Sequence, residues 1–417
     1  MHINVKNTTK ILEADILLNG ITVIAGYNNV GKSTILKAAY IIFRTFRNSD
    51  IRVRKIRKKS LDSYLFNWGY YNGQRALGLP SGFLLELARK MSDHLEIFSD
   101  TQKDNFYMVK KMFIESIKDY QGYSDTIEDL LKSLYESMHE IATRDGKEAL
   151  KYLAEMYIQN VFNGQINSLY YNSLASINVD SDMEKYFLAI KENKITDMRF
   201  SINAYPDVFY LPAYHLLDMM EKSSFENKIH TPVSEIQSAL MAQNEEPTWE
   251  EYQEMEQNTE QVKEILEEVL HGKLVKSPSG SIVFQDEVLH GSIDLVNVAS
   301  GMKNLLVIQS LIEKGKLKRN GILMIDEPET NLHPQWHLKF AEVLVLLYKH
   351  MGIRIIVNSH SPYFIRALEV NMADEQLKDQ GHYYLMEEAG GNLFQTRDVT
   401  DHTDQIYKLL YHPLEYL

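Results

Sequence analysis

Short alternating runs open the chain, and a run of mainly apolar residues follows them. His2 to Val5 and Ile11 to Leu18 alternate apolar and polar residues, which predicts strands with one buried face. Ile21 to Ala25 consists mainly of β-branched residues without a charged side chain, which predicts a strand buried on both faces. A glycine loop comes next, and from Ser33 to about Phe43 apolar residues return at helical spacing. The N-terminal pattern therefore predicts strands followed by a helix that lies on a sheet.

The C-terminal third has a similar rhythm after a hairpin-like stretch at Gly272 to Val296. Helices and buried strands then alternate in four predicted elements: helix Asn304 to Glu313, strand Gly321 to Ile325, helix Gln335 to His350 and strand Ile353 to Asn358. Three further elements are expected to close the sheet and cap it: strands Tyr383 to Met386 and Leu393 to Val399, and helix Asp404 to Tyr411. Such alternation is typical of a largely parallel sheet covered by helices.

The middle of the chain is mainly helical by its pattern. Apolar residues recur at helical spacing from Asp125 to Ile141, and further helices are predicted at Leu150 to Val161 and within the acidic stretch Glu245 to Glu268. Between Arg199 and Tyr214 the pattern returns to strands. We therefore expect one discontinuous α/β domain, residues 1–45 and 271–417, separated by a mainly helical insertion with some strands at 46–270.

Composition limits the cellular compartment and the partners expected for this fold. The 417 residues are 44% hydrophobic, contain no cysteine and carry a net charge of −13. No apolar run approaches the roughly 18 residues of a membrane span, so we expect a soluble, cytoplasmic protein without disulfides or membrane association. The charge disfavours a generally nucleic-acid-binding surface, although Arg44 to Lys59 is locally basic.

The glycine loop after the first buried strand matches GxxxxGK[ST], the phosphate-binding pattern. Glycines let backbone N–H groups surround a phosphate at the start of a helix, Lys32 would neutralise phosphate oxygens, and the Ser33 hydroxyl would bind Mg²⁺. The bland alternative is an ordinary glycine turn capped by Ser33. The predicted nucleotide-binding residues of this loop are Gly26, Tyr27, Asn28, Asn29, Val30, Gly31, Lys32, Ser33 and Thr34.

Two acids end the predicted strand Gly321 to Ile325. Asp326 would hold Mg²⁺, and Glu327 would polarise the water that attacks the γ-phosphate of ATP. Adjacent carboxylates at a strand end can also be solvated or can cap the next helix. The glycine loop elsewhere in the chain favours the catalytic interpretation.

IDEPETNLHP from Ile325 to Pro334 and VNSHSP from Val357 to Pro362 resemble the ABC-type ATPases of the RecF and overcoming-lysogenization-defect (OLD) group. The resemblance implies an ABC-type P-loop ATPase head, with a mixed or parallel sheet and a large mainly helical insertion. It also implies that His360 is the catalytic switch residue that senses the γ-phosphate. A hydrogen-bonded polar histidine at a strand end is the alternative.

The stretch Asn297 to Lys303 is similar to the signature of this group. The resemblance implies that Ser300, Gly301 and Lys303 contact ATP held by another copy, so that two chains sandwich two ATP molecules in a homodimer or higher oligomer. A helix cap at Ser300 and a solvated Lys303 are the alternatives. The glutamine loop of the group is not located; Gln74 and Gln237 are candidates without supporting context.

OLD relatives often carry a C-terminal Toprim nuclease, for which the residues after the switch region leave no room. We therefore expect the regulatory ATPase of a bacterial anti-phage defence system, sensing DNA or protein and controlling a separate effector, a nuclease or toxin. The alternatives are a RecF-type DNA-repair ATPase and a nucleotide-gated scaffold with little turnover. DNA would contact Arg44 to Lys59, a stretch that could equally be solvated or bind the acidic helix.

Overall fold

Two compact units make up the protein. The computed structural model describes residues 1–68, 106–108, 110–111, 125–170, 173–181, 185–201, 207–213, 217, 230–242, 249–278, 280–288 and 291–412. One unit comprises residues 1–47 and 154–417, and the other comprises 48–153. Residues 154–270, expected within the insertion, are thus grouped with the two terminal segments, because part of this stretch supplies strands to their sheet.

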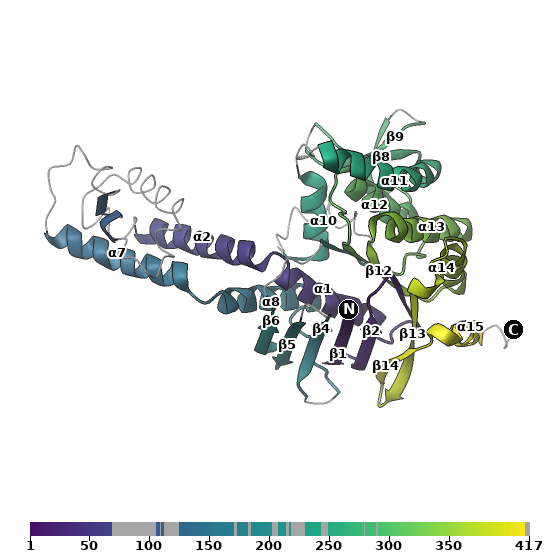
Figure 1. The fold of residues 1–417 in the computed structure, drawn as a ribbon, viewed down its shortest axis with the longest axis horizontal. Coiled ribbons are helices and arrows are strands. Elements are labelled where there is room, and N and C mark those ends of the chain that lie inside the picture. The colour runs from purple at the N-terminus through teal and green to yellow at the C-terminus, as the bar shows by residue number, and fades with distance from the viewer. Residues whose placement is uncertain are drawn as a thin grey trace. The chain divides into compact units, whose positions relative to one another are not determined.

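The larger unit is built on an eleven-stranded sheet with the order β6-β5-β4-β1-β2-β14-β13-β3-β12-β11-β7 (Figure 1). Its strands are β1 (His2–Thr8), β2 (Ile11–Leu17), β3 (Ile21–Ala25), β4 (Ala175–Asp180), β5 (Lys185–Lys191), β6 (Lys194–Phe200), β7 (Val208–Leu211), β11 (Ile322–Asp326), β12 (Arg354–Ser359), β13 (Gly381–Gly390) and β14 (Leu393–Asp398). The strands predicted before and after the insertion are therefore neighbours in one sheet.

The sheet is mixed, and its two halves differ in direction. β13, β3, β12, β11 and β7 run parallel to one another, whereas β6, β5, β4, β1 and β2 form an antiparallel series. β14 joins the halves, since it is antiparallel to β13 and parallel to β2. The expected mixed α/β fold is confirmed, but the expectation of a largely parallel sheet holds for one half only.

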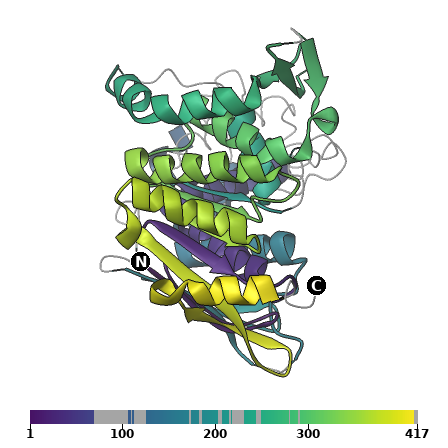
Figure 2. The same ribbon diagram turned by 90° about the vertical axis from the view of Figure 1, so that its right-hand side faces the viewer.

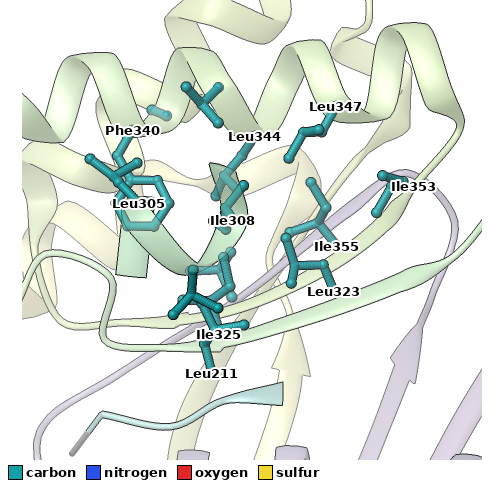
Figure 3. Close-up of a cluster of buried hydrophobic side chains, with 14 of the residues drawn as sticks. Leu211, Leu305, Ile308, Leu323, Ile325, Phe340, Leu344, Leu347, Ile353 and Ile355 are labelled. Atoms are coloured by element: carbon teal, nitrogen blue, oxygen red, sulfur yellow. The ribbon is translucent and has the colours of Figure 1, made fainter. Parts of the chain in front are cut away.

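Helices cover both faces of the parallel half. On one face, α12 (Lys303–Glu313), α13 (Pro334–Met351) and α14 (Pro362–Asp374) pack on alternate residues of the strands. Figure 3 shows Leu323 and Ile325 of β11 beneath Leu305 of α12 and Phe340 of α13. α13 and α14 lie side by side (Figure 2). The helix α1 (Lys32–Phe46) contacts the same strands and places Ile35, Leu36 and Ala39 in the interior.

Smaller elements complete the larger unit. They are the helices α10 (Pro232–Met241), α11 (Trp249–Leu270) and α15 (Asp404–Tyr411), and a three-stranded antiparallel sheet of β8 (Gly272–Lys276), β9 (Ile282–Asp286) and β10 (Gly291–Asp294). The acidic helix α11 packs on α13, where Glu268 forms an ion pair with Lys339 at 3.1 Å. The predicted hairpin and acidic helix are both present.

The smaller unit contains two described helices that pack on each other. They are α2 (Ser49–Trp68) and α7 (Asp125–Thr143). Val53, Leu61 and Leu65 of α2 and Leu134 and Met138 of α7 are buried. The unit boundary falls within α8 (Gly146–Phe162).

The predicted basic stretch divides into two parts with different surroundings. Arg44 is buried and paired with Glu235, and Arg47 is paired with Asp207, so these two side chains hold α1 to the larger unit. Arg54, Lys55, Lys58 and Lys59 of α2 are exposed. Only the α2 part of the stretch therefore presents an exposed basic face.

The edge strand β6 has two buried residues among exposed and half-buried ones. Ile195 and Met198 are buried, whereas Lys194 and Arg199 are exposed, and Arg199 donates to Asp197 at 2.9 Å.

Within the described residues, no helix has the length and apolar character needed to cross a bilayer.

Candidate phosphate-binding and hydrolytic site

The glycine loop lies between β3 and α1, as its sequence predicts. Gly26 and Gly31 have φ values of 154° and 96°, and Asn29 has φ 68°. A Cβ atom at Gly31 would lie 2.6 Å from Cδ1 of Ile11, so both the backbone conformation and the space require glycine there. Asparagine tolerates the left-handed conformation better than most residues, which suits Asn29. Local chemistry thus explains why this segment turns sharply into the helix.

Lys32 lies at the centre of the loop. Its side chain is buried, with 5% of the residue exposed, and its Nζ donates to the carbonyl oxygens of Gly26 (2.9 Å) and Tyr27 (2.8 Å). Burial lowers the pKa of Lys32, while the negative charges of Glu327, Asp326 and Glu329 oppose this shift. The ammonium group is therefore within the electrostatic reach of the acids that follow β11.

Asp326 is delivered rigidly by the end of β11. The residue is only 3% exposed, and its carboxylate accepts hydrogen bonds from Asn358 Nδ2 (3.0 Å) and from the Tyr210 hydroxyl (3.3 Å). Burial raises the pKa of Asp326, and interactions with Ser33 and Asn358 oppose that shift. The influence of Ser33 on this pKa indicates that the glycine loop lies near the acid at the strand end, although the two are far apart in sequence.

Glu327 turns away from the strand direction. Its backbone has φ 50°, a left-handed conformation that few glutamates adopt, and its N–H donates to Asn358 O at 2.9 Å. The carboxylate is partly exposed, and its Oε1 lies 3.6 Å from Nδ1 of His360. Hydrogen bonding to His360 lowers the pKa of Glu327, so this carboxylate remains ionised at neutral pH.

His360 lies between two carboxylates. Its Nδ1 is 3.6 Å from Glu327 Oε1 and 3.3 Å from Glu329 Oε1. Hydrogen bonding to Glu327 raises the pKa of His360, and the charge of Glu329 adds to this effect while burial opposes it. The predicted switch residue is therefore brought together with the predicted catalytic acid.

The predicted signature residues lie beside the loop that follows Glu327. Ser300, Gly301 and Met302 form a single 3₁₀ turn before α12, and Lys303 is buried. A Cβ atom at Gly301 would lie 2.3 Å from Asn331 O, in that loop. In the part of the chain that the structure describes, the hydrogen bonds of Lys32 and Asp326 go to none of residues 300–303.

The remaining loop residues make supporting contacts. The Tyr27 hydroxyl donates to Leu409 O of α15 at 2.8 Å, Thr34 Oγ1 lies 3.1 Å from Thr9 Oγ1, and Val30 is buried. Asn28 is exposed. Of the glutamine-loop candidates, Gln74 lies outside the described residues and Gln237 lies on α10.

This constellation agrees with a comparison of the sequence with known families. The model of the AAA ATPase domain family matches residues 1–365, most of the chain. The chain belongs to the AAA ATPase domain family. The match includes the glycine loop, both acids and His360, so the contacts above are those of an AAA ATPase domain.

Among individual proteins, this AAA ATPase domain is similar to the Septu protein PtuA of Bacillus thuringiensis, with 30% identity over 121 residues. That match covers 26% of this chain and 29% of PtuA, so the chain spans less than a third of this relative's length.

Solved SMC head domains are also similar over nearly the whole chain. The SMC head of Thermotoga maritima covers 95% of this chain and 98% of that one, with TM-score 0.37 and 10% identity. An SMC head bound to the C-terminal winged-helix domain of ScpA covers 97% and 98%, with TM-score 0.46 and 9% identity. These likenesses are too distant to carry an argument about function.

A magnesium ion fits the donor set of this AAA ATPase domain. Ser33 offers a hydroxyl and Asp326 a carboxylate, hard oxygen ligands that lie near each other. The described residues include no cluster of three or more His, Cys, Asp or Glu side chains suited to a metal. Phosphate oxygens of a nucleotide would therefore have to complete the coordination shell.

Sequence reasoning missed four residues of the site. Asn358 and Tyr210 hold Asp326, Glu329 contacts the loop after β12, and Lys10 donates to Asn29 O (3.2 Å) and Oδ1 (2.9 Å). Asn358 and Glu329 lie within the two quoted motifs, so a signal was present. Lys10 and Tyr210 lie in segments with no motif, and only the pairing of the strands brings them to the site.

Proposed function

We propose that this chain binds Mg-ATP in the glycine loop and hydrolyses it with Glu327 as the group that polarises water. The shared edge of the parallel strands carries the proposal. β3 ends at Ala25, in register with Ser359 of β12, and β11 ends at Asp326, in register with Asn358, so the predicted phosphate loop and the predicted metal-binding acid follow neighbouring strand ends. Lys32, held inside the loop by two carbonyl oxygens, would exchange these partners for phosphate oxygens. Membership of the AAA ATPase domain family supports the same reaction.

The acids and His360 have separate tasks in this proposal. Magnesium, when bound, neutralises the charge that develops on the transferred phosphoryl group. Glu327 is ionised and partly exposed, so it can accept a hydrogen bond from an attacking water. His360, paired with Glu327, would change partner when a γ-phosphate arrives and so register the nucleotide state.

Two variants test the reaction. Lys32→Ala should abolish ATP binding, and Glu327→Gln should bind ATP normally but hydrolyse it about 10²- to 10⁴-fold more slowly. Glu13→Gln, which changes an ion-paired carboxylate on β2, is the matched control and should turn over like the wild type. Equal turnover in Lys32→Ala, Glu327→Gln and wild type would reject the assigned roles. Tight binding without turnover in the wild type would instead identify a nucleotide-gated scaffold.

We further propose that two copies sandwich ATP. The resemblance of the stretch Asn297 to Lys303 to the signature of ABC-type ATPases supports completion of each site by a second copy, and Ser300 and Gly301 lie in the turn that leads into α12. Ser300→Arg and Lys32→Ala should each be inactive alone. Mixed together they should recover activity, because a mixed dimer contains one intact loop facing one intact signature. Mixed dimers that form without any recovery would rule out the sandwich.

The biological role that we propose is the regulatory ATPase of an anti-phage defence system with a separate effector. The partial similarity to the Septu protein PtuA supports this assignment. Cells carrying the chain with its neighbouring genes should reduce phage plaque counts, and Lys32→Ala should restore them. Equal plaque counts in all strains, across a panel of phages, would reject the role.

DNA is the trigger or partner that the exposed basic face of α2 supports. This face consists of Arg54, Lys55, Lys58 and Lys59. Changing these four residues to alanine should weaken DNA binding and flatten its dependence on salt, because fewer counterions are released. The matched control changes four exposed basic residues of β5 and β6 to alanine, namely Lys185, Lys191, Lys194 and Arg199. Equal loss in both quadruple variants would reject a specific α2 contact.

A further inference from the structure

Glu329 is a buried acid that the proposed reaction leaves without a task. It lies in the loop between β11 and α13, and only 6% of the residue is exposed. Its main chain is held from α13, since its carbonyl oxygen lies 3.3 Å from Nε2 of the buried His337. A carboxylate that merely capped a helix would be hydrated, and burying one without partners is costly. We therefore expect hydrogen-bond donors around this carboxylate that offset the free-energy cost of its burial.

One oxygen of Glu329 gathers three donors from the loop after β12. Its Oε1 accepts from the Ser359 hydroxyl at 2.8 Å, from the His360 N–H at 2.9 Å and from the Ser361 N–H at 3.1 Å. Hydrogen bonds to an ionised acceptor are about twice as strong as neutral ones. Residues 359–361 are thus tied to the loop that also carries Glu327.

The same oxygen also lies beside the imidazole ring. Glu329 Oε1 is 3.3 Å from His360 Nδ1, and the Glu327 carboxylate lies on the same nitrogen at 3.6 Å. Glu329 therefore holds the backbone of His360 by a hydrogen bond, and its carboxylate lies beside the ring. Ser361 extends the arrangement, because its hydroxyl accepts from Phe364 N at 3.3 Å and caps α14.

We propose that Glu329 is a positioning residue: by anchoring residues 359–361 it holds His360 against Glu327, so that the switch and the hydrolytic acid move as one. The role in turnover rests on the proposed ATPase function. The anchoring itself belongs to the protein without nucleotide and can be measured separately.

Turnover tests the role with a double-mutant cycle. Glu329→Ala should lower kcat about 100-fold, the scale of a misplacement of about 1 Å in a reacting site, while the Kd for ATP stays within about twofold. Glu329→Gln, whose amide oxygen can still accept from the loop, should stay within about fivefold of wild type. In a His360→Ala background, Glu329→Ala should lower kcat by less than about threefold, because the residue acts through His360. Full additivity would overturn the proposal.

Hydrogen exchange tests the anchoring in the nucleotide-free protein. The amides of His360 and Ser361 should exchange at least about tenfold faster in Glu329→Ala than in wild type, because each loses its acceptor. Glu329→Gln should keep most of the protection. If the alanine variant does not fold, Glu329→Asp withdraws the carboxylate by one methylene and should give the same acceleration.

The two measurements separate the possible failures. If the amides exchange faster in Glu329→Ala but the wild type shows no ATP turnover, the anchor is supported and the proposed function is rejected. Normal turnover in the wild type, with unchanged exchange and kcat in Glu329→Ala, would reject the anchor alone. A rise in Kd equal to the fall in kcat would also reject it, since that pattern indicates a general loss of the nucleotide site.

Discussion

The two halves of the eleven-stranded sheet differ in direction and in burial. β3 and β11 are buried along their whole length, whereas β4 alternates buried and half-buried residues, and the predicted site residues lie in the parallel half. In the parallel half, Ala25 of β3 is in register with Ser359 of β12, and Asn358 of β12 with Asp326 of β11. Parallel strands all end at the same edge, so the glycine loop, the acids and the switch loop emerge together. In the antiparallel half successive strands end at opposite edges, and among the described residues the hairpin of β1 and β2 contacts the glycine loop through Thr9, Lys10 and Ile11.

This contrast teaches that strand direction is the main determinant of the site, whereas burial alone is not. Ile177 of β4 and Ile356 of β12 are both fully buried. Both halves contribute stability. The parallel half also brings the glycine loop, the acids and the switch loop to one edge of the sheet. Four predictions test that division, in order of decreasing expected effect.

Gly31→Ala should have the largest effect. The left-handed backbone alone costs about 1–2 kcal/mol, and the new Cβ would also overlap Ile11. We expect loss of ATP binding by more than about 30-fold, measured by titration calorimetry, because the loop N–H groups would be displaced. Gly390→Ala is the matched control: its φ is 99°, and nothing lies within 4 Å of the added Cβ. It should cost only the backbone strain and leave ATP affinity unchanged.

Ile177→Ala should lower the free energy of unfolding by about 2–5 kcal/mol through a cavity in the antiparallel half. Because β4 does not reach the site, kcat and KM of the folded protein should stay within about twofold. Urea unfolding and ATPase kinetics at 25 °C measure the two quantities. Ile356→Ala, with the same burial in the parallel half, should lose similar stability and also perturb kinetics. Identical kinetic behaviour of the two variants would break the comparison.

Lys10→Met should have a smaller effect, located where the antiparallel half touches the site. The Lys10 ammonium holds the left-handed Asn29 by its carbonyl and side-chain oxygens. Its removal should raise the Kd for ATP about 3- to 10-fold, the equivalent of one or two hydrogen bonds. Lys6→Met, which removes an ion pair to Glu13 at 2.8 Å on the same hairpin, should leave Kd unchanged. The double variant Lys10→Met with Asn29→Gly should recover affinity, since glycine needs no such support.

The smallest effect should be the pH dependence contributed by His360. Its folded-state pKa is raised, chiefly by Glu327, so its pairing stabilises the fold most below the ordinary value of about 6.5. That contribution should decline as the pH rises through the folded-state pKa. Because the pair is partly exposed, the difference in unfolding free energy between wild type and His360→Asn should stay below about 1 kcal/mol. The pH slope of this difference should shrink in a Glu327→Gln background.

Much of the parallel half could be predicted from the sequence, because its elements are local and strongly patterned. The strand Ile21–Ala25 and the helix Asp404–Tyr411 have the predicted bounds, and β11 and β12 differ by one residue at either end. β4, β5 and most of β6 were missed as strands. Periodicity can indicate a strand but not its partner, and β4 pairs with β1, which lies far earlier in the chain.

The site divides in the same way. Lys32, Ser33, Asp326 and Glu327 could be named because phosphate chemistry fixes their spacing and context. Glu329 lies within the quoted motif Ile325 to Pro334, but its role could not be predicted, because that role lies in three hydrogen bonds to residues 359–361 that no local pattern encodes.

The charged edge strand β6 has a consequence for how copies of this protein meet. Lys194, Asp197 and Arg199 interrupt a border that would otherwise invite another strand, and such interruptions protect proteins from ribbon-like polymerisation. Association of two copies is therefore directed away from continuation of the β-sheet at β6. The proposed ATP sandwich, in which loops and not strand edges meet, is compatible with this border.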